Sequence, residues 1–540
     1  MIRGMIQLPQ STSICYLKHF FISIVLIITL SNTCDSQDKS IAKIDQVFSL
    51  IEQFYKDSVD MSPLVETAIR SALNELDPHT SYFTREEFET MNESLKGNFE
   101  GIGISYQTID DSVLIVAVME GSPAEKAGLF PGDFILSADG TPISGQKDAE
   151  ESVRRLIGGK KGTLVELLIK KPEQVEPVKF LIERDKIPVK SVETVYKTND
   201  LTGYIRLTRF SATTGVELKK AFKELNKGED CKSIILDLRG NGGGYLDKAV
   251  EVADEFLSDD KTIVYTQGRN NPRKNYRATS KGDFEVGNLY VLVDERSASA
   301  SEIVAGALQD WDRGMIIGRR TFGKGLVQRQ FMLNDSSAIR LTIAAYFTPT
   351  GRCIQKPYSD GNEEYIDEIF NREKNGELLA LDSSKMVDSL MYKTLVNQRK
   401  VYGGGGIFPD IFIPTDTTGT AIIMRKMSRT GVFSRAAVSY YSIRFKKLEN
   451  QYPTEEEFIR HYLPDEEAIQ QLLKYVPMED RGIVFSGNEQ LRTEFKQLYT
   501  AHLGKLLFGT SSFFRIINAM DPAYLKAISL SEGKQTTTLQ

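Results

Sequence analysis

The chain has 540 residues, of which 41% are hydrophobic and 26% are charged, so we expect several globular domains and exclude a disordered chain and a membrane protein with many spans. Lys and Arg number 67 against 73 Asp and Glu, which gives a net charge of -6 and argues against a nucleic-acid partner. With 4 His, 4 Cys and neither a Cys-x-x-Cys nor a His-Glu-x-x-His sequence, a local zinc site is not expected.

Residues 1–34 are typical of an export signal. Basic residues precede the apolar run 20–30, which is about half the ~20 residues that a membrane-spanning helix needs. Small residues then precede Cys34 and resemble a loose bacterial lipoprotein box with Cys34 as the lipidated residue, although Ser31 stands where Leu is usual. The alternative is a short anchor that is never cleaved. Both interpretations place residues 35–540 in the bacterial periplasm or cell envelope.

Residues 35–95 are predicted to form a small helical unit, because apolar residues recur at steps of three and four. The unit contains a turn-rich segment, residues 77–83. His79 is a candidate base there, but a histidine in a turn beside Asp77 more often has only a structural hydrogen-bonding role, which we favour.

Residues 96–185 are predicted to be a small, mostly β domain, since short alternating runs are separated by Gly and Pro turns. One helix is expected after Ser122, with a proline at its first position and a glycine after its end.

A glycine loop opens this domain and consists of Gly101, Ile102, Gly103 and Ile104. Its backbone N–H groups could converge on a peptide's terminal carboxylate, although for this loop taken alone a plain turn is the better interpretation. Together with Gly-Ser-Pro-Ala-x-x-Ala-Gly and Pro-Gly-Asp, which follow in order, the loop resembles a PDZ domain. PDZ domains bind extended C-termini by adding the peptide to a sheet as a strand.

Residues 186–417 alternate between strands and helices, as an α/β fold requires. Strands are expected at 233–238, 289–293 and 315–317, and helices at 245–257 and 302–309. A polar insertion spans 359–400, and residues 418–540 form a helix-rich extension to which the sequence assigns no role.

Three segments of the α/β unit are candidates for chemistry. The first, residues 239–244, is a glycine-rich loop between a strand and a helix that offers backbone N–H donors. The second contains Ser299, which with Glu302 forms a helix capping box. The same placement directs the positive end of the helix dipole at Ser299, which would stabilise a developing oxyanion.

The third segment, residues 318–325, nearly matches a phosphate-binding loop, so a nucleotide hydrolase is an alternative. Two features argue against it: Gly325 replaces the hydroxyl residue that would hold Mg²⁺, and the residues that follow alternate like a strand. Lys324 is instead a candidate general base if apolar burial lowers its pKa. Gln328 could hold the neutral amine, whereas a carboxylate partner would keep it charged.

Three ordered motifs strongly resemble the C-terminal processing (tail-specific) serine peptidases. They are Leu-Asp-Leu-Arg-Gly-Asn-Gly-Gly-Gly at 236–244, Ser-Ala-Ser-Ala-Ser-Glu-Ile at 297–303 and Thr-Phe-Gly-Lys-Gly-Leu-Val-Gln at 321–328. Further matches at 346–352 and 406–410 extend the resemblance over about 40–415.

The resemblance implies a multidomain α/β protein: a crotonase-like peptidase core with an inserted PDZ domain, a helical N-terminal unit and a helix-rich C-terminal extension. It implies Ser299 as the nucleophile, Lys324 as the base and Gln328 as the residue that orients the lysine. The oxyanion donors would be the backbone N–H groups of Gly243 and Ala300, and no cofactor is needed.

Proteins with apolar C-termini are the implied substrates, with an adaptor or a second copy of the chain as further candidate partners. A catalytically dead PDZ scaffold is the alternative from another class. The intact set of Ser299, Lys324 and Gln328 counts against it.

Overall fold

The computed structural model describes residues 40–109, 112–143, 149–172, 174–381, 386–485 and 489–533. The predicted signal segment and Cys34 lie outside these residues. Within them, no helix combines the length and the apolar character that a membrane span needs. The chain divides into two compact units, Met1–Leu76 and Asp77–Gln540.

In the first unit, the described residues 40–76 form two helices, as the apolar periodicity predicts. One covers residues 40–54, and the second is α2 (Met61–Asn74). Asp60 caps α2, since its carboxylate accepts a hydrogen bond from the Ser62 N–H at 3.0 Å.

The second unit begins with a turn and the short strand β1 (Ser81–Phe83), followed by helix α3 (Arg85–Lys96). Strand β1 pairs antiparallel with β18 (Ala338–Phe347) and so belongs to a sheet of the α/β core. The sequence places residues 81–83 in the helical N-terminal unit instead. A three-residue strand is too short to show an alternating pattern, and its pairing partner lies far along the chain.

The predicted PDZ region is a mostly β domain whose entering and leaving strands pair with each other. Strand β2 (Asn98–Gly101) enters the domain and pairs antiparallel with β9 (Asp185–Pro188), which leaves it. The main sheet has the order β3-β4-β5-β7-β8, with β6 paired to β5. These strands are β3 (Ile104–Ile109), β4 (Ser112–Val118), β5 (Phe134–Ala138), β6 (Thr141–Pro142), β7 (Leu164–Lys170) and β8 (Val178–Glu183).

Two helices accompany this sheet, α4 (Pro123–Ala127) and α5 (Ala149–Ile157). The predicted cap of α4 is present, because the Ser122 hydroxyl accepts from the Glu125 N–H at 3.2 Å. Gly128 ends the helix in the left-handed conformation, as expected.

The core contains a six-stranded sheet with the order β10-β11-β12-β15-β16-β21, in which only the β10–β11 pair is antiparallel. Its strands are β10 (Val192–Asn199), β11 (Thr202–Leu207), β12 (Ser233–Asp237), β15 (Asn288–Val293), β16 (Met315–Gly318) and β21 (Ile411–Phe412). Helices α6 (Thr214–Leu225), α7 (Leu246–Asp254) and α8 (Ala300–Asp310) connect them. The predicted strands and helices of this region are confirmed to within a few residues.

A second sheet of the core has the order β1-β18-β13-β14, and β17 also pairs with β18. The strands not yet given are β13 (Thr262–Gly268), β14 (Asn271–Arg277) and β17 (Leu326–Met332). The predicted polar insertion contains α9 (Asn362–Lys374), the short helix η2 (Asp388–Leu390), and strands β19 (Met391–Lys393) and β20 (Lys400–Tyr402).

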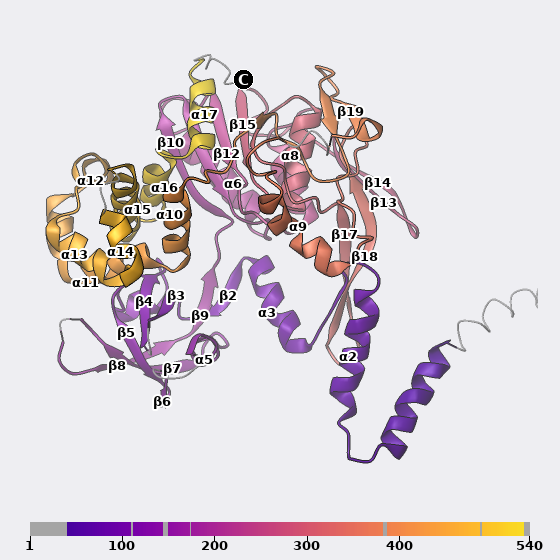
Figure 1. Ribbon diagram of the computed structural model, residues 1–540, viewed down its shortest axis with the longest axis horizontal. Coiled ribbons are helices and arrows are strands. Elements are labelled where there is room, and N and C mark those ends of the chain that lie inside the picture. The colour runs from indigo at the N-terminus through magenta and orange to yellow at the C-terminus, as the bar shows by residue number, and fades with distance from the viewer. Residues whose placement is uncertain are drawn as a thin grey trace, which may run out of the picture. The chain divides into compact units, whose positions relative to one another are not determined.

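The C-terminal extension is a helical domain with its own hydrophobic core around Phe433, Phe458 and Phe495. Of its helices, drawn in orange and yellow, Figure 1 shows all but α17 gathered in one group. They are α10 (Gly419–Arg429), α11 (Val432–Gln451), α12 (Glu455–His461), α13 (Glu466–Tyr475), α14 (Met478–Phe485), α15 (Glu489–Phe508), α16 (Thr510–Asn518) and α17 (Pro522–Ser531).

This extension contacts both the predicted PDZ domain and the α/β core. Phe445 of α11 stacks on Phe130 of the PDZ domain with ring centroids 6.4 Å apart. Helix α17 runs beside the six-stranded sheet (Figure 1), where Tyr524 meets Tyr204 edge to face. The extension therefore bridges the two domains that the sequence predicts to carry substrate binding and catalysis.

Candidate active site

Ser299 lies at the sharp turn between strand β15 and helix α8. Its backbone angles are φ 57° and ψ -112°, a conformation that costs a non-glycine residue of order 1–3 kcal/mol. The two neighbouring serines hold this turn in place: Ser297 Oγ donates to the Leu238 carbonyl and Ser301 Oγ to the Asn241 carbonyl, both at 2.8 Å.

Ser297 and Ser301 are fully buried, whereas Ser299 is partly exposed. The outer serines of the Ser-Ala-Ser-Ala-Ser motif therefore anchor the turn to the glycine-rich loop. Of the three serines of this motif, Ser299 alone is partly exposed.

The glycine-rich loop packs directly against this turn. A Cβ atom on Gly243, where φ is +102°, would lie 2.8 Å from Ser299 Cβ and 3.0 Å from Ala300 N. The structure thus brings together the two segments that carry the predicted oxyanion donors. The Ala300 N–H, at the first position of α8, has no carbonyl partner within the helix. The Gly243 N–H, however, donates to Asn241 Oδ1 at 2.9 Å, a bond that an oxyanion would have to displace.

Lys324 lies on the loop between β16 and β17, and the Glu302 carboxylate ties this loop to the serine turn. Glu302 is fully buried and accepts from the backbone N–H groups of Ser299 (2.8 Å), Gly323 (2.7 Å) and Lys324 (2.9 Å). It also accepts from the Thr321 hydroxyl at 2.6 Å. The predicted interaction between Glu302 and the Ser299 backbone is present, and the same carboxylate also positions the lysine loop, which the sequence does not reveal.

Tyr346 makes a second connection between the same two segments. This buried side chain reaches the Ser299 carbonyl at 3.0 Å through its hydroxyl, which also donates to the Lys324 carbonyl. The backbone of the proposed nucleophile and that of the proposed base are therefore held together on two sides.

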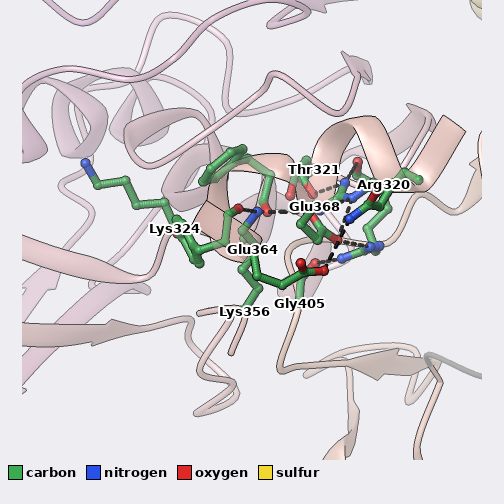
Figure 2. A network of polar contacts seen from close by, with 12 residues as sticks. Arg320, Thr321, Lys324, Lys356, Glu364, Glu368 and Gly405 are labelled. Atoms are coloured by element: carbon green, nitrogen blue, oxygen red, sulfur yellow. Dashed lines mark hydrogen bonds and ion pairs between the residues drawn. The ribbon is translucent and has the colours of Figure 1, made fainter. Parts of the chain in front are cut away.

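The environment of the Lys324 amine favours its neutral form. Burial, and next the charge of Arg340, lower the pKa of Lys324 from 10.5 to about 8, against weaker opposing effects of Glu302 and Asp77. In the part of the chain that the structure describes, no carboxylate forms an ion pair with this amine. Figure 2 shows its side chain extending away from the charged cluster formed by Arg320, Lys356 and Glu368.

Gln328 lies on β17 directly opposite Thr342 of β18. Its Nε2 donates to Thr342 Oγ1 at 3.4 Å, a long hydrogen bond. The predicted orienting residue, Gln328, is thus hydrogen-bonded to a side chain of the neighbouring strand.

His79 has the structural role that the sequence favours. Its Nε2 forms a hydrogen bond with the Tyr365 hydroxyl at 2.8 Å. Burial, and next the charge of Lys324, lower the pKa of His79 to about 3. A group with this pKa is neutral at pH 7 but accepts a proton far less readily than Lys324, so His79 is a poor candidate for the base.

A buried ion-pair cluster supports the lysine loop from the other side, and sequence reasoning missed it. Arg372 of α9 donates to the carbonyls of Arg320, Thr321 and Phe322 at 2.9 to 3.0 Å. Glu368, one turn earlier, pairs with both Arg372 and Arg320 (Figure 2). The charged i, i+4 pair in the polar insertion was the one sequence signal, and it does not reveal a partner so distant in the chain.

The predicted carboxylate loop of the PDZ domain precedes β3, which is an edge strand of its sheet. Gly103 adopts φ +81°, and a Cβ there would lie 2.4 Å from Ser122 Cβ, so a glycine is required. Within the described part of the chain, strand β3 pairs with β4 only, and its Gln107 also contacts Ser434 of α11. Among the described residues, no group of three or more His, Cys, Asp or Glu is placed to hold a metal ion.

Three family models match the chain. "Peptidase family S41" matches residues 201–363, "PDZ domain" matches 114–171, and "Activating protease CtpB N-terminal domain" matches 26–87.

Curated relatives show the same similarity. The chain is 37% identical over 325 residues to the carboxy-terminal processing protease CtpB of Bacillus subtilis. This match covers 59% of this chain and 66% of that protein. The chain is also 37% identical over 357 residues to a carboxy-terminal-processing protease of Bartonella bacilliformis. That match covers 63% of this chain and 80% of that protein. Among solved structures, a photosystem II D1 C-terminal processing protease matches with 28% identity over 70% of this chain and 90% of its own, at a TM-score of 0.37.

Proposed function

The chain belongs to the carboxy-terminal processing protease family of S41 peptidases, and we propose that it is an exported endopeptidase that cleaves proteins near apolar C-termini with a Ser299–Lys324 dyad. Neutral Lys324 accepts the proton of the Ser299 hydroxyl, which attacks the peptide carbonyl. An acyl-enzyme forms, and water then releases it. Gln328 orients the amine, and backbone N–H groups of the glycine-rich loop and of Ala300 bind the oxyanion. The reaction needs no cofactor.

The observation that carries this proposal is the state of Lys324. Its amine is buried without a carboxylate partner in the described part of the chain, its pKa is lowered to about 8, and its loop shares Glu302 with the serine turn. A group with a pKa of about 8 is about one-tenth neutral at pH 7, compared with about 0.03% for an unperturbed lysine. Burial therefore makes several hundred times more base available.

The PDZ domain would capture the substrate's C-terminal tail at the edge of β3, with the terminal carboxylate at residues 101–104. Export to the periplasm or cell envelope follows from the signal-like residues 1–34, with Cys34 as the site of a lipid tether. An adaptor or a second copy of the chain are further candidate partners. The mass of the exported protein tests lipidation directly.

The proposed function is tested by incubating the exported chain, residues 35–540, with an unfolded protein, without metal and then with Mg²⁺ and ATP. We expect proteolysis without either addition. Ser299→Ala and Lys324→Ala should abolish it, and so should Lys324→Arg, because a guanidinium stays protonated. Robust cleavage by Lys324→Arg would contradict the assignment of the base.

Inactivity of the wild type would favour a PDZ scaffold, and ATP hydrolysis would favour the nucleotide hydrolase. Substrates that differ only in their last few residues test the role of the PDZ domain. Equal cleavage of apolar and charged tails would remove that role.

A further inference from the structure

Asp77 is a buried carboxylate in the turn before β1, and the proposed mechanism does not use it. Its side chain is 7% exposed. It accepts hydrogen bonds from the backbone N–H groups of His79 (2.8 Å) and Thr80 (3.0 Å) and from the Thr80 hydroxyl (2.6 Å). These bonds shape the local turn. A further hydrogen bond connects Asp77 to a residue outside the turn.

Asp77 also reaches across to the second core sheet. Thr342 of β18 donates its hydroxyl hydrogen to Asp77 Oδ1 at 3.0 Å, and the Thr342 N–H donates to the Thr80 hydroxyl at 3.2 Å. The same Thr342 oxygen is the acceptor for Gln328 Nε2. A continuous chain of hydrogen bonds therefore connects Asp77 to Gln328, the residue proposed to orient the base.

The direction of this chain is determined at its carboxylate end. An ionised carboxylate can only accept hydrogen bonds, so the single Thr342 hydroxyl hydrogen is committed to Asp77. The Thr342 oxygen then has only lone pairs to offer Gln328, and a lone pair can bind only the NH₂ side of a carboxamide. Gln328 is thereby held with its amide nitrogen toward Thr342 and its carbonyl oxygen on the opposite side.

We propose that Asp77 and Thr342 are positioning residues that fix the orientation of the Gln328 carboxamide, so that its carbonyl oxygen accepts from the neutral Lys324 amine. This inference rests on the proposed function and names how Gln328 is kept in its active orientation. A neutral amine has two N–H donors and one lone pair. When Gln328 accepts one N–H, the lone pair stays free for the Ser299 hydroxyl.

A flipped carboxamide would have the opposite effect. Its NH₂ group would donate to the amine lone pair and so compete with Ser299 for the base. Without the Thr342 hydroxyl, both orientations of Gln328 become accessible. The enzyme would then lose rate without losing affinity for its substrate.

The test compares two substitutions of Thr342 in the exported chain, residues 35–540, one that removes the hydroxyl and one that keeps it. Thr342→Val removes the hydroxyl and keeps the shape, and we expect kcat to fall about 10- to 100-fold with KM within twofold. Thr342→Ser keeps the hydroxyl and should recover most of that loss. As a control, the wild type should cleave and Ser299→Ala should not. If the control holds and Thr342→Val and Thr342→Ser are equally active, this proposal is overturned while the proposed function stays intact.

A double-mutant cycle shows whether the effect passes through Gln328. In a Gln328→Ala background, Thr342→Val should lower kcat by less than twofold, because there is no carboxamide left to orient. The same 10- to 100-fold loss in both backgrounds would show that Thr342 acts on the fold instead. Melting curves of all four proteins, with activity measured well below the lowest midpoint, keep the comparison within folded protein.

Asp77→Asn provides a third readout, the pH profile. The charged groups that act on Lys324 are Arg340 on β18, Glu302 on α8 and Asp77 in the turn before β1, and Lys324 itself acts on the nearby His79. Because the Asp77 charge raises the pKa of Lys324, its removal in Asp77→Asn should shift the acid limb of kcat/KM to lower pH. The Asn carbonyl oxygen can still accept from Thr342, so the plateau should fall only in Asp77→Ala, which removes this acceptor. Thr342→Val keeps the charge and should leave the limb in place. An unchanged plateau in Asp77→Ala would refute the role of Asp77.

Discussion

The acid limb of the pH profile is a direct measure of the proposed base, and Arg340 offers a way to move it. Arg340 lies on β18, with its guanidinium over the ring of Phe83 at 5.0 Å from the centroid. Its charge is the second largest cause, after burial, of the lowered pKa of Lys324. We predict that Arg340→Gln shifts the acid limb of kcat/KM to higher pH and that Arg340→Lys does not.

The sign follows from the charges. A positive neighbour disfavours protonation of the amine, so Arg340 lowers the pKa of Lys324, and removing the charge lets that pKa rise from about 8 toward its usual 10.5. At pH 7, each unit of rise lowers the neutral fraction about tenfold. The plateau at high pH, where Lys324 is neutral in every variant, should change much less.

The assay is initial-rate cleavage of a quenched peptide with an apolar C-terminus between pH 5 and 11. The wild type should show a unit slope below about pH 8 and a plateau above it. Two results would refute the reasoning: an acid limb near pH 6.5, which indicates a histidine, or a limb that stays in place in Arg340→Gln.

Two further substitutions probe the surroundings of the dyad. Gly243→Ala should lower kcat at least 100-fold, because at this positive φ its Cβ would lie 2.8 Å from Ser299 Cβ. Gly242→Ala is the control and should keep most of the activity, since a Cβ there meets nothing within 4 Å. Asp521, the cap of α17, also binds Arg239 of the glycine-rich loop at 2.6 Å. Asp521→Asn keeps the cap and should cost about 1–2 kcal/mol of unfolding free energy in urea, while Asp521→Ala should cost about 1 kcal/mol more.

The local features of this protein were predictable because neighbouring residues determine them. The cap at Ser122, the placement of Glu302 three residues after Ser299, and the buried strand at 233–237 all depend on residues within a few positions. The candidate site residues could also be named in advance, since the motifs that carry them are contiguous. Strand β1 was missed because its only evidence is a pairing with β18.

The properties that make these residues a site depend on contacts across the chain. The Leu238 and Asn241 carbonyls accept hydrogen bonds from Ser297 and Ser301, and these contacts distinguish Ser299 from the other two serines. The lowered pKa of Lys324 arises from burial and from Arg340, and no short sequence window contains either cause. The same holds for Arg372, whose guanidinium binds three carbonyls of the lysine loop from a helix in the polar insertion.

The amino-acid sequence by itself determined the residue types, the caps and the order of the motifs, because these follow from short-range sterics and hydrogen bonding. Only the tertiary structure decided that Glu302 and Tyr346 join the serine turn to the lysine loop, and that the C-terminal extension reaches both the PDZ domain and Arg239. The physical reason is that desolvation and long-range hydrogen bonds exist only once distant segments are packed together, and desolvation is the largest cause of the lowered pKa of Lys324, the proposed base.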